Sequence, residues 1–300
     1  MKSYIIGLVA IVVISVGGYY AYQWYSNESN IFKSQISKTN ETEPVDEVVE
    51  VVNERETNIG TSVGEHAITA YHYGSGEKEI LFVGGIHGGY EWNTVLVAYE
   101  LMDYLEGNPR AVPENERVTV IPVLNPDGLQ KTVGTDGRFT ASDVPTASGA
   151  TVPGRFNGNE VDLNRNFDCD WQANATWQNR AVSGGSEAFS EPESKAVRDY
   201  ILANKPDAVV VWYSAAGGVF ASNCHDGVLS ETNTLTKLYA DASGYPAFQS
   251  FDFYEITGDM VNWLAKEKIP AISVLLTNHT DTEWSKNQKG ILALLEYFAE

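Results

Sequence analysis

The stretch at residues 80–105 constrains the fold most, because it joins a strand, a glycine-rich turn and a helix. Residues 80–83, Ile-Leu-Phe-Val, form an apolar run that is typical of a buried strand. The following Gly-Gly-Ile-His-Gly-Gly-Tyr-Glu carries paired glycines, which permit a tight turn and the close approach of another group. Glu91 begins a segment with apolar residues at helical spacing. His87 and Glu91 are therefore either two metal ligands or an ordinary hydrogen-bonded pair.

Strand-like and helix-like segments alternate from residue 58 to the end of the chain. Apolar runs predict buried strands at 80–83, 118–123, 208–212 and 271–276. A capping box at Ser190, with Pro192 in the first turn, predicts a helix through Leu202, and further helices are predicted at 258–268 and 285–298. This alternation predicts a single α/β domain over 58–300, with a mixed, mostly parallel sheet covered by helices on both faces.

The first 27 residues predict a transmembrane anchor. Residues 3–27 contain no charged side chain, Lys2 precedes the apolar run, and tyrosines and a tryptophan cluster at its far end. The positive end is expected to stay inside, which places the rest of the chain outside the cytoplasm. A cleaved signal peptide, which would release a secreted domain, is the alternative, although no small-x-small cleavage site follows the apolar run.

Residues 28–57 are polar and then strongly acidic, which predicts an extended, self-repelling linker. The whole chain has 40 acidic residues against 20 basic ones, a net charge of −20. No basic stripe offsets this charge, so a general nucleic-acid-binding function is excluded.

Three further motifs carry polar side chains in loop-like positions. Asn-Pro-Asp-Gly at 125–128 is, by itself, a turn at the end of a strand. Arg155 and the run VDLNRNF at 161–167 bring arginines and amides together, which suits bidentate capture of a carboxylate. Surface arginines paired with neighbouring acids are the alternative. Tyr254 begins the third motif, YEITGD, which is also compatible with a plain helix start.

In this order and spacing, the motifs resemble the zinc carboxypeptidase (carboxypeptidase A-like) family from about residue 60 to the C-terminus. The resemblance implies a mixed sheet of about eight strands between helices. It also implies a zinc-dependent hydrolase acting on peptide C-termini, in which His87 and Glu91 are the first two zinc ligands. Asn164 and Arg165 match the clamp on the substrate's terminal carboxylate, and Tyr254 matches the mobile tyrosine that closes over it.

The same resemblance suggests roles for several other residues. Arg155 is the first candidate for stabilising the oxyanion, and Arg138 is the second. Val261 falls where the family places the pocket for the terminal side chain. Cys169 and Cys224 match no metal or redox motif, and two thiols are expected in a cytosolic chain. Because the segments that carry them both approach the edge of the site, we predict a disulfide between them.

The sequence departs from the family at two positions that the chemistry needs. The strand at 208–212 is followed by Tyr213 and Ser214, where the family has its third ligand, a histidine. Leu275 occupies the position of the general-base glutamate on the last core strand. Phenol is a poor zinc ligand at neutral pH, and loss of a general base lowers a rate about 10²–10⁴-fold. A smaller departure is that three residues, not two, separate His87 from Glu91.

Two hypotheses follow for function. In the first, the domain binds peptide C-termini, from extracellular or cell-wall peptides, with hydrolysis impaired or lost and zinc occupancy left open. In the second, it is an active zinc exopeptidase with an unusual ligand set, such as His87 and Glu91 with Tyr213 or His225. His279 and Glu283 follow the last core strand and are considered as substitutes, but an ordinary capping or surface role is expected for both.

Overall fold

The structure is a computed structural model that describes residues 55–300. The expected anchor at 1–27 and almost all of the expected linker at 28–57 lie outside the described residues. No helix within 55–300 has the length and apolar character needed to cross a membrane. The first strand, β1 (Glu56–Thr61), begins inside the last residues of the expected linker.

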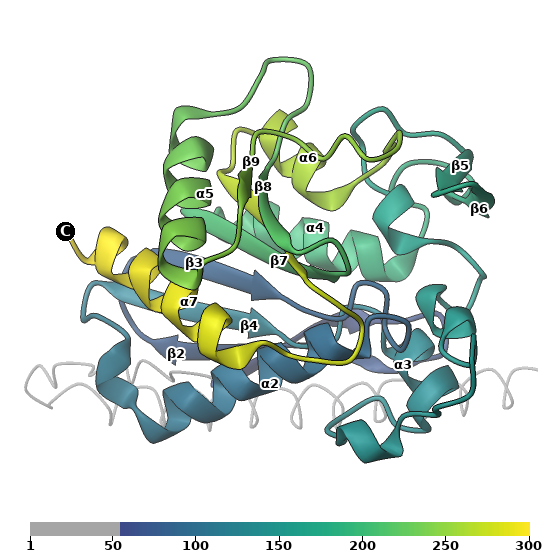
Figure 1. The fold of residues 1–300 in the computed structure, drawn as a ribbon, viewed down its shortest axis with the longest axis horizontal. Helices are drawn as coiled ribbons and strands as arrows, with labels where there is room; N and C mark the ends of the chain where they lie inside the picture. The colour runs from purple at the N-terminus through teal and green to yellow at the C-terminus, as the bar shows by residue number, and fades with distance from the viewer. Residues whose placement is uncertain (1–54) are drawn as a thin grey trace, which may run out of the picture. The chain divides into compact units, whose positions relative to one another are not determined.

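An eight-stranded mixed sheet runs through the domain (Figure 1) in the order β1-β2-β4-β3-β7-β10-β8-β9. Its four central strands, β4, β3, β7 and β10, are mutually parallel, while β2 and β8 run antiparallel to their inner neighbours. The strands after β1 are β2 (Ala67–Gly74), β3 (Lys78–Val83), β4 (Glu116–Ile121), β7 (Ala208–Ser214), β8 (Gly218–Ala221), β9 (Ala247–Phe248) and β10 (Ala271–Leu276).

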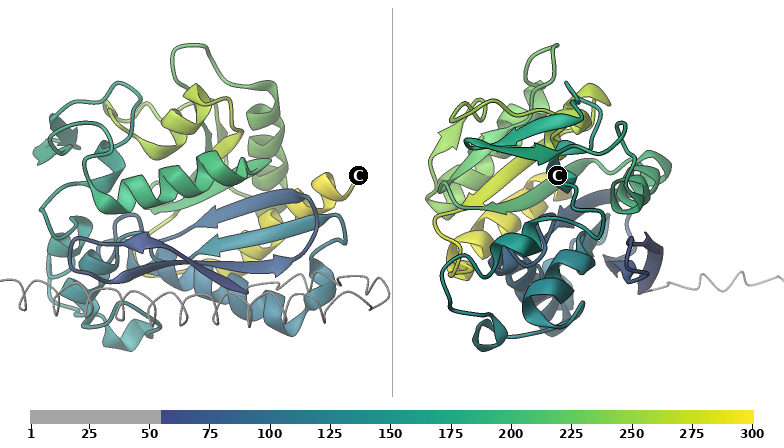
Figure 2. Two further views of the ribbon diagram at one scale, coloured as in Figure 1. Left: turned by 180° about the vertical axis from the view of Figure 1, so that it is seen from behind. Right: turned by 90° about the vertical axis from the view of Figure 1, so that its right-hand side faces the viewer.

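Helices cover both faces of the sheet (Figures 1 and 2). One apolar core lies under α2 (Trp92–Gly107), α5 (Ser230–Ser243) and α7 (Trp284–Ala299), and the other under α4 (Pro192–Asn204) and α6 (Met260–Lys266). Side chains alternate between the two along each strand, so Trp212 enters the first core while Val211 and Tyr213 enter the second. This alternation fixes which strand residues can face the site.

Shorter elements complete the domain. The helix α3 (Pro126–Val133) follows β4, and β5 (Asn174–Trp177) forms a separate hairpin with β6 (Arg180–Ser183). Four 3₁₀ turns lie in the connections, at Pro109–Ala111, Ala141–Asp143, Val152–Arg155 and Leu163–Arg165.

The structure confirms the four predicted buried strands, and it corrects two expectations about local sequence. Ser190 does not cap α4: Glu191 occupies the N-cap position, and the Ser190 hydroxyl donates to the Glu191 carboxylate at 2.7 Å. The segment at 125–128 is more than a turn. The Asn125 side chain accepts from Gly128 N at 2.8 Å, and Pro126 begins α3.

Candidate ligand-binding site

A cavity of about 290 Å³ opens at the carboxyl ends of the central parallel strands. It collects side chains that are far apart in the sequence, because β3, β7 and β10 end at the same edge of the sheet. All nine site residues proposed first from the sequence line it: His87, Glu91, Arg155, Asn164, Arg165, Tyr213, Tyr254, Val261 and Leu275.

His87 lies in the turn between β3 and α2 and is buried between two carboxylates. Its Nε2 is 3.0 Å from Asp162 Oδ1, and its Nδ1 is 3.0 Å from Glu91 Oε1. The turn depends on glycine, because Gly88 has φ +37° and a Cβ there would lie 2.6 Å from the Asn125 carbonyl oxygen. The turn therefore aims both side chains of the pair into the cavity.

Arg155 supplies the positive charge next to this pair. Its Nε donates to Asp162 Oδ2 at 2.8 Å, and its Nη1 lies 3.4 Å from His87 Nδ1 and 3.8 Å from Glu91 Oε1. Burial opposes ionisation of Asp162, but the charges of Arg155 and His87 outweigh it and hold the pKa of this carboxyl well below its usual range. Asp162 thus remains a carboxylate that fixes both His87 and Arg155.

Tyr213 lies across the cavity from His87, with ring centroids 6.1 Å apart. Its hydroxyl donates to Asn164 Oδ1 at 3.2 Å. Burial raises the pKa of this phenol well above its usual value, and the nearby Asp259 and Glu91 carboxylates raise it further. The phenol therefore stays neutral and bonded to the amide at neutral pH.

These donors do not fit a catalytic zinc site, which takes three deprotonated protein ligands and keeps one open position. His87 and Glu91 supply two, and the neutral Tyr213 phenol supplies no third. Across residues 55–300, the only group of three His, Cys, Asp or Glu side chains close enough to share a metal ion is Cys169, Cys224 and His225, outside the cavity.

Leu275 leaves the cavity without a carboxylate on the last core strand. It pairs in register with Tyr213 on β7, so both side chains face the same side of the sheet. The wall around it is apolar, with Phe220, Phe251 and Val261 also lining the cavity. One side of the cavity is thus charged and the other is aromatic and aliphatic.

Arg165 is a second buried cation in the cavity. It is 1% exposed; its Nε donates to the Thr176 carbonyl at 3.0 Å and its Nη1 to the Asn164 carbonyl at 2.6 Å. Its Nη2 is buried and has no hydrogen-bond partner within the described part of the chain. A buried guanidinium with an unused donor is suited to an anionic ligand group.

Asn164 and Tyr254 lie beside this guanidinium. The Asn164 amide donates to Asp259 Oδ2 at 2.9 Å, and its oxygen accepts from Tyr213 and from Met260 N, so the side chain is held rigidly. Burial raises the pKa of Tyr254, which keeps its hydroxyl protonated and able to donate a hydrogen bond.

Three residues weighed as alternatives lie outside the cavity. Arg138 pairs with Asp103 at 2.7 Å and stacks over Tyr99, because the segment after α3 runs along the outer face of α2. His225 is exposed and pairs with Asp170 at 3.1 Å. Glu283 accepts from Thr277 N and pairs with Lys286, both at 2.6 Å, and its side chain does not cap α7.

The structure adds cavity residues that the motifs did not reveal. Trp177, at the end of β5, lies over the Arg155 guanidinium with 4.3 Å between the ring centroid and Cζ, and it contacts Tyr90 edge-on. His279 was expected to have a capping or surface role, but it lines the cavity, with Nδ1 2.8 Å from Ser214 Oγ, and burial lowers its pKa. The sequence signal for Trp177 was the alternation of polar and apolar residues in β5, Asn-Ala-Thr-Trp, which predicts that the tryptophan faces inward.

The fold and these motifs together indicate the family to which the chain belongs. The family model described as zinc carboxypeptidase matches residues 35–283, and the chain belongs to this family. Among curated relatives, the mouse (Mus musculus) carboxypeptidase N catalytic chain is 27% identical over 169 residues, covering 51% of this chain and 32% of that protein. Carboxypeptidase B of Helicoverpa zea is 29% identical over 196 residues, covering 62% and 44%. The chain thus spans less than half the length of these relatives.

Solved structures share the fold at lower identity. Bovine thrombin-activatable fibrinolysis inhibitor, in complex with a tick carboxypeptidase inhibitor, matches with a TM-score of 0.62 and 17% identity, covering 81% of this chain and 88% of that one. A murein-tripeptide amidase from Escherichia coli O157 matches with a TM-score of 0.56 and 20% identity, covering 80% and 91%. At these identities the likeness establishes the fold alone.

Proposed function

We propose that this protein binds the free C-termini of peptides without hydrolysing them efficiently. The observation that carries the proposal is the buried Arg165 guanidinium, which lines the cavity next to the fixed Asn164 amide and the Tyr254 hydroxyl. A terminal carboxylate would accept from Arg165 in a water-poor site, where charge-assisted hydrogen bonds are strong. The ligand's last side chain would lie against the apolar wall that includes Phe220, Val261 and Leu275.

Two features of the same cavity support the proposal that hydrolysis is impaired. The neutral Tyr213 cannot complete a set of three zinc ligands, and Leu275 cannot remove a proton from water. Family members normally bind zinc, which supplies Lewis-acid polarisation and an acidified water when present. In this chain His87 and Glu91 remain as a partial set, so we expect weak or absent zinc binding.

An active exopeptidase is the second candidate, and two observations favour it. The pair formed by His87 and Glu91 is intact at 3.0 Å, and His279 lines the same cavity with a pKa lowered by burial. A neutral imidazole could serve as an alternative proton acceptor. Stoichiometric zinc in the purified wild-type protein, with peptide turnover abolished by His87→Ala, would establish this candidate and end the binding-only proposal.

The binding proposal is tested with two probes that differ only at the carboxyl group. N-acetyl-Ala-Ala-Phe and its C-terminal amide are titrated against the protein by calorimetry. The free acid is expected to bind about tenfold more tightly or better, because a hydrogen bond to a charged group contributes roughly 1.5–3 kcal/mol. Arg165→Met is expected to remove this preference. The control Arg180→Met, which removes an exposed guanidinium that also lies over the Trp177 ring, is expected to keep it.

Equal affinity for acid and amide, or an unchanged preference in Arg165→Met, would show that Arg165 is not a carboxylate clamp. Thermal unfolding of both variants guards against a trivial loss of folding, since Arg165 also donates to two backbone carbonyls.

We further propose that residues 1–27 anchor the protein with its N-terminus inside, and that residues 28–57 hold the domain away from an extracytoplasmic membrane surface. The supports are the uncharged apolar run after Lys2 and the acidic linker. Protease added to intact cells or spheroplasts should release a soluble fragment from about residue 55 onward. Recovery of a shortened chain in the medium without protease would instead indicate a cleaved signal peptide.

A further inference from the structure

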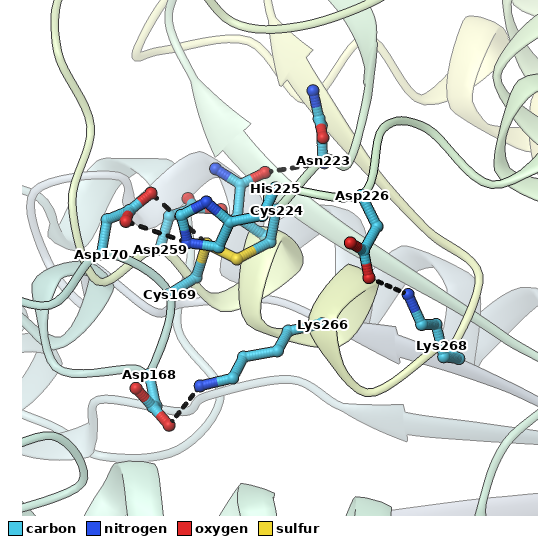
Figure 3. The surroundings of a disulfide bond; sticks show 11 residues. Asp168, Cys169, Asp170, Asn223, Cys224, His225, Asp226, Asp259, Lys266 and Lys268 are labelled. Carbon is cyan, nitrogen blue, oxygen red and sulfur yellow. Dashed lines mark hydrogen bonds and ion pairs between the residues drawn. A yellow bond between two sulfur atoms is a disulfide. The ribbon is translucent and has the colours of Figure 1, made fainter.

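A disulfide joins Cys169 to Cys224, on two segments that adjoin the cavity (Figure 3). Cys169 follows the VDLNRNF motif, and Cys224 follows β8, with 55 residues of separation. The Cys169 carbonyl accepts from Gly258 N at 2.7 Å, and Asn223 N donates to Asn262 Oδ1 at 3.0 Å. The structure thus confirms the predicted disulfide and shows that it fastens the segments carrying Arg165 and Asp259.

A histidine and a carboxylate lie directly on this disulfide. The two sulfur atoms and a ring nitrogen of His225 all lie within 4.8 Å of one another. Asp170 is 3.1 Å from His225 Nε2 through Oδ1 and 3.9 Å from Cys169 Sγ through Oδ2 (Figure 3). Both His225 and Asp170 have left-handed backbone conformations, at φ +56° and +53°, so two local turns converge on the sulfurs.

Two acidic side chains around the disulfide are paired with lysines. Lys266 pairs with Asp168 at 2.7 Å, and Lys268 pairs with Asp226 at 2.5 Å. Within residues 55–300, Asp170 forms no ion pair with lysine or arginine and faces only His225 and the sulfur of Cys169. Asp170 is therefore placed to orient the His225 imidazole beside the two sulfurs.

We propose that reduction of this disulfide creates a site for zinc or another thiophilic divalent cation, bound by Cys169, Cys224 and His225. A dithiol reductant supplies two electrons and two protons, which break the S–S bond and leave two thiols while the reductant forms its own disulfide. The cation then displaces both thiol protons into solvent and binds the thiolates. Asp170 accepts from the other ring nitrogen of His225 and orients it, and water completes the coordination.

The geometry needs only a local change. Zinc–sulfur bonds are about 2.3 Å, so a tetrahedral site places its two sulfurs roughly 3.8 Å apart. The sulfurs part by less than about 2 Å to reach this separation, which side-chain rotation at both cysteines supplies. Both cysteines are buried, so the metal–thiolate bonds would be shielded from solvent, whereas His225 is exposed and leaves a path for the ion.

The consequence is that the cavity wall stays fastened under both oxidising and reducing conditions. The disulfide or the metal ion would link the Cys169 segment to the Cys224 segment, and Gly258 remains bonded to Cys169 in either state. This site is separate from His87 and Glu91, so it stands or falls independently of the proposed peptide-binding function.

Cobalt provides a direct test on the full-length chain. The protein is reduced with dithiothreitol, desalted without oxygen and titrated with Co²⁺. One equivalent is expected to produce thiolate-to-cobalt charge-transfer absorption together with the visible bands of a tetrahedral site, and added Zn²⁺ is expected to displace it. The oxidised protein should give neither signal. Asp170→Asn is expected to weaken binding by about 10–100-fold.

Matched variants distinguish this site from other histidines. His225→Ala and Cys224→Ser should lose the charge-transfer signal. His66→Ala, which removes a half-buried histidine paired with Asp136 at 2.8 Å, and His87→Ala should keep it. No thiolate signal in reduced protein that retains its circular dichroism spectrum, or full binding in His225→Ala, would overturn the proposal.

Discussion

At the scale of single residues, two side chains on neighbouring strands decide what the cavity can do. Tyr213 and Leu275 are paired in register and face the same side of the sheet as His87 and Glu91. The surroundings are otherwise organised, because the Asp162 carboxylate contacts both His87 and Arg155. The cavity therefore has no imidazole at position 213 and no carboxylate at position 275, although its other charged side chains are held by hydrogen bonds and ion pairs.

Restoring both groups should restore metal chemistry. Tyr213→His with Leu275→Glu is expected to bind about one zinc per chain and to hydrolyse N-acetyl-Ala-Ala-Phe at least about 10²-fold faster than wild type, since it regains a ligand and a base. Zinc is measured by atomic emission and products by chromatography. Tyr213→Phe with Leu275→Gln, similar in volume, should remain inactive. If the first pair binds no zinc, the extra residue between His87 and Glu91 becomes the cause.

Glu116 provides a second prediction at this scale. Its carboxyl group is buried at the start of β4, neither oxygen has a partner within residues 55–300, and burial raises its pKa to about 7. Because the folded-state pKa exceeds the unfolded one, stability is fully present below about pH 4.5 and falls as the pH rises through about 7. The free energy of unfolding should therefore drop by about 1–3 kcal/mol between pH 5 and pH 8 from this group.

Denaturant unfolding at both pH values measures the effect. Glu116→Gln should remove most of this drop, while the exposed neighbour Glu114→Gln should retain it. An identical pH dependence in Glu116→Gln and wild type would place the responsible group elsewhere.

At the scale of elements, close packing between helices supports the sheet from which the site is built. Gly290 in α7 packs against the Tyr239 ring of α5, where a Cβ would lie 2.5 Å from the ring. Tyr239 in turn accepts a hydrogen bond from Trp212 on β7 at 3.4 Å. The α5–α7 contact is therefore joined to the strand that carries Tyr213.

Gly290→Ala should separate these helices and lower the free energy of unfolding by about 1–3 kcal/mol, the usual cost of overpacking a core. Gly107→Ala, at the last residue of α2 with open space around it, is the matched control. It is expected to be neutral or stabilising by up to about 1 kcal/mol, because alanine lowers the entropy of the unfolded chain. Urea unfolding compares the two, and equal effects would contradict the packing argument.

At the scale of the whole molecule, the disulfide between Cys169 and Cys224 closes a long loop that includes β5, β6, α4, β7 and β8. It joins segments that both form walls of the cavity, so its effect should reach stability and ligand affinity together.

Loss of this cross-link in Cys169→Ser with Cys224→Ser should lower the free energy of unfolding by about 2–4 kcal/mol, since the unfolded chain regains the entropy of an open loop. Thermal melting is measured with a chelator present, so that no metal binds the thiols of reduced wild type. The double variant and reduced wild type should show similar decreases in melting temperature relative to oxidised wild type. If the double variant has the same melting temperature as oxidised wild type, the cross-link does not constrain the unfolded chain.

Local sequence was sufficient for much of the fold and for the residues first proposed for the site. Apolar runs at 80–83, 118–123, 208–212 and 271–276 became central strands, since a strand buried on both faces tolerates little else. Short-range rules were less reliable at element ends. Ser190 resembles a cap, but its hydroxyl bonds Glu191 and also accepts from Asn166, a partner brought close by the fold.

The sequence by itself determined the family and the strand–turn–helix that carries His87 and Glu91, and it predicts the replacements at Tyr213 and Leu275, because these depend on residue type and spacing along the chain. Only the tertiary structure decided which charges meet in the cavity. It placed Trp177 over Arg155, brought His279 to Ser214, directed Arg138 to the surface and left an Arg165 nitrogen unpartnered among the described residues. These contacts join distant segments, and their energies depend on burial and distance, which no local pattern encodes.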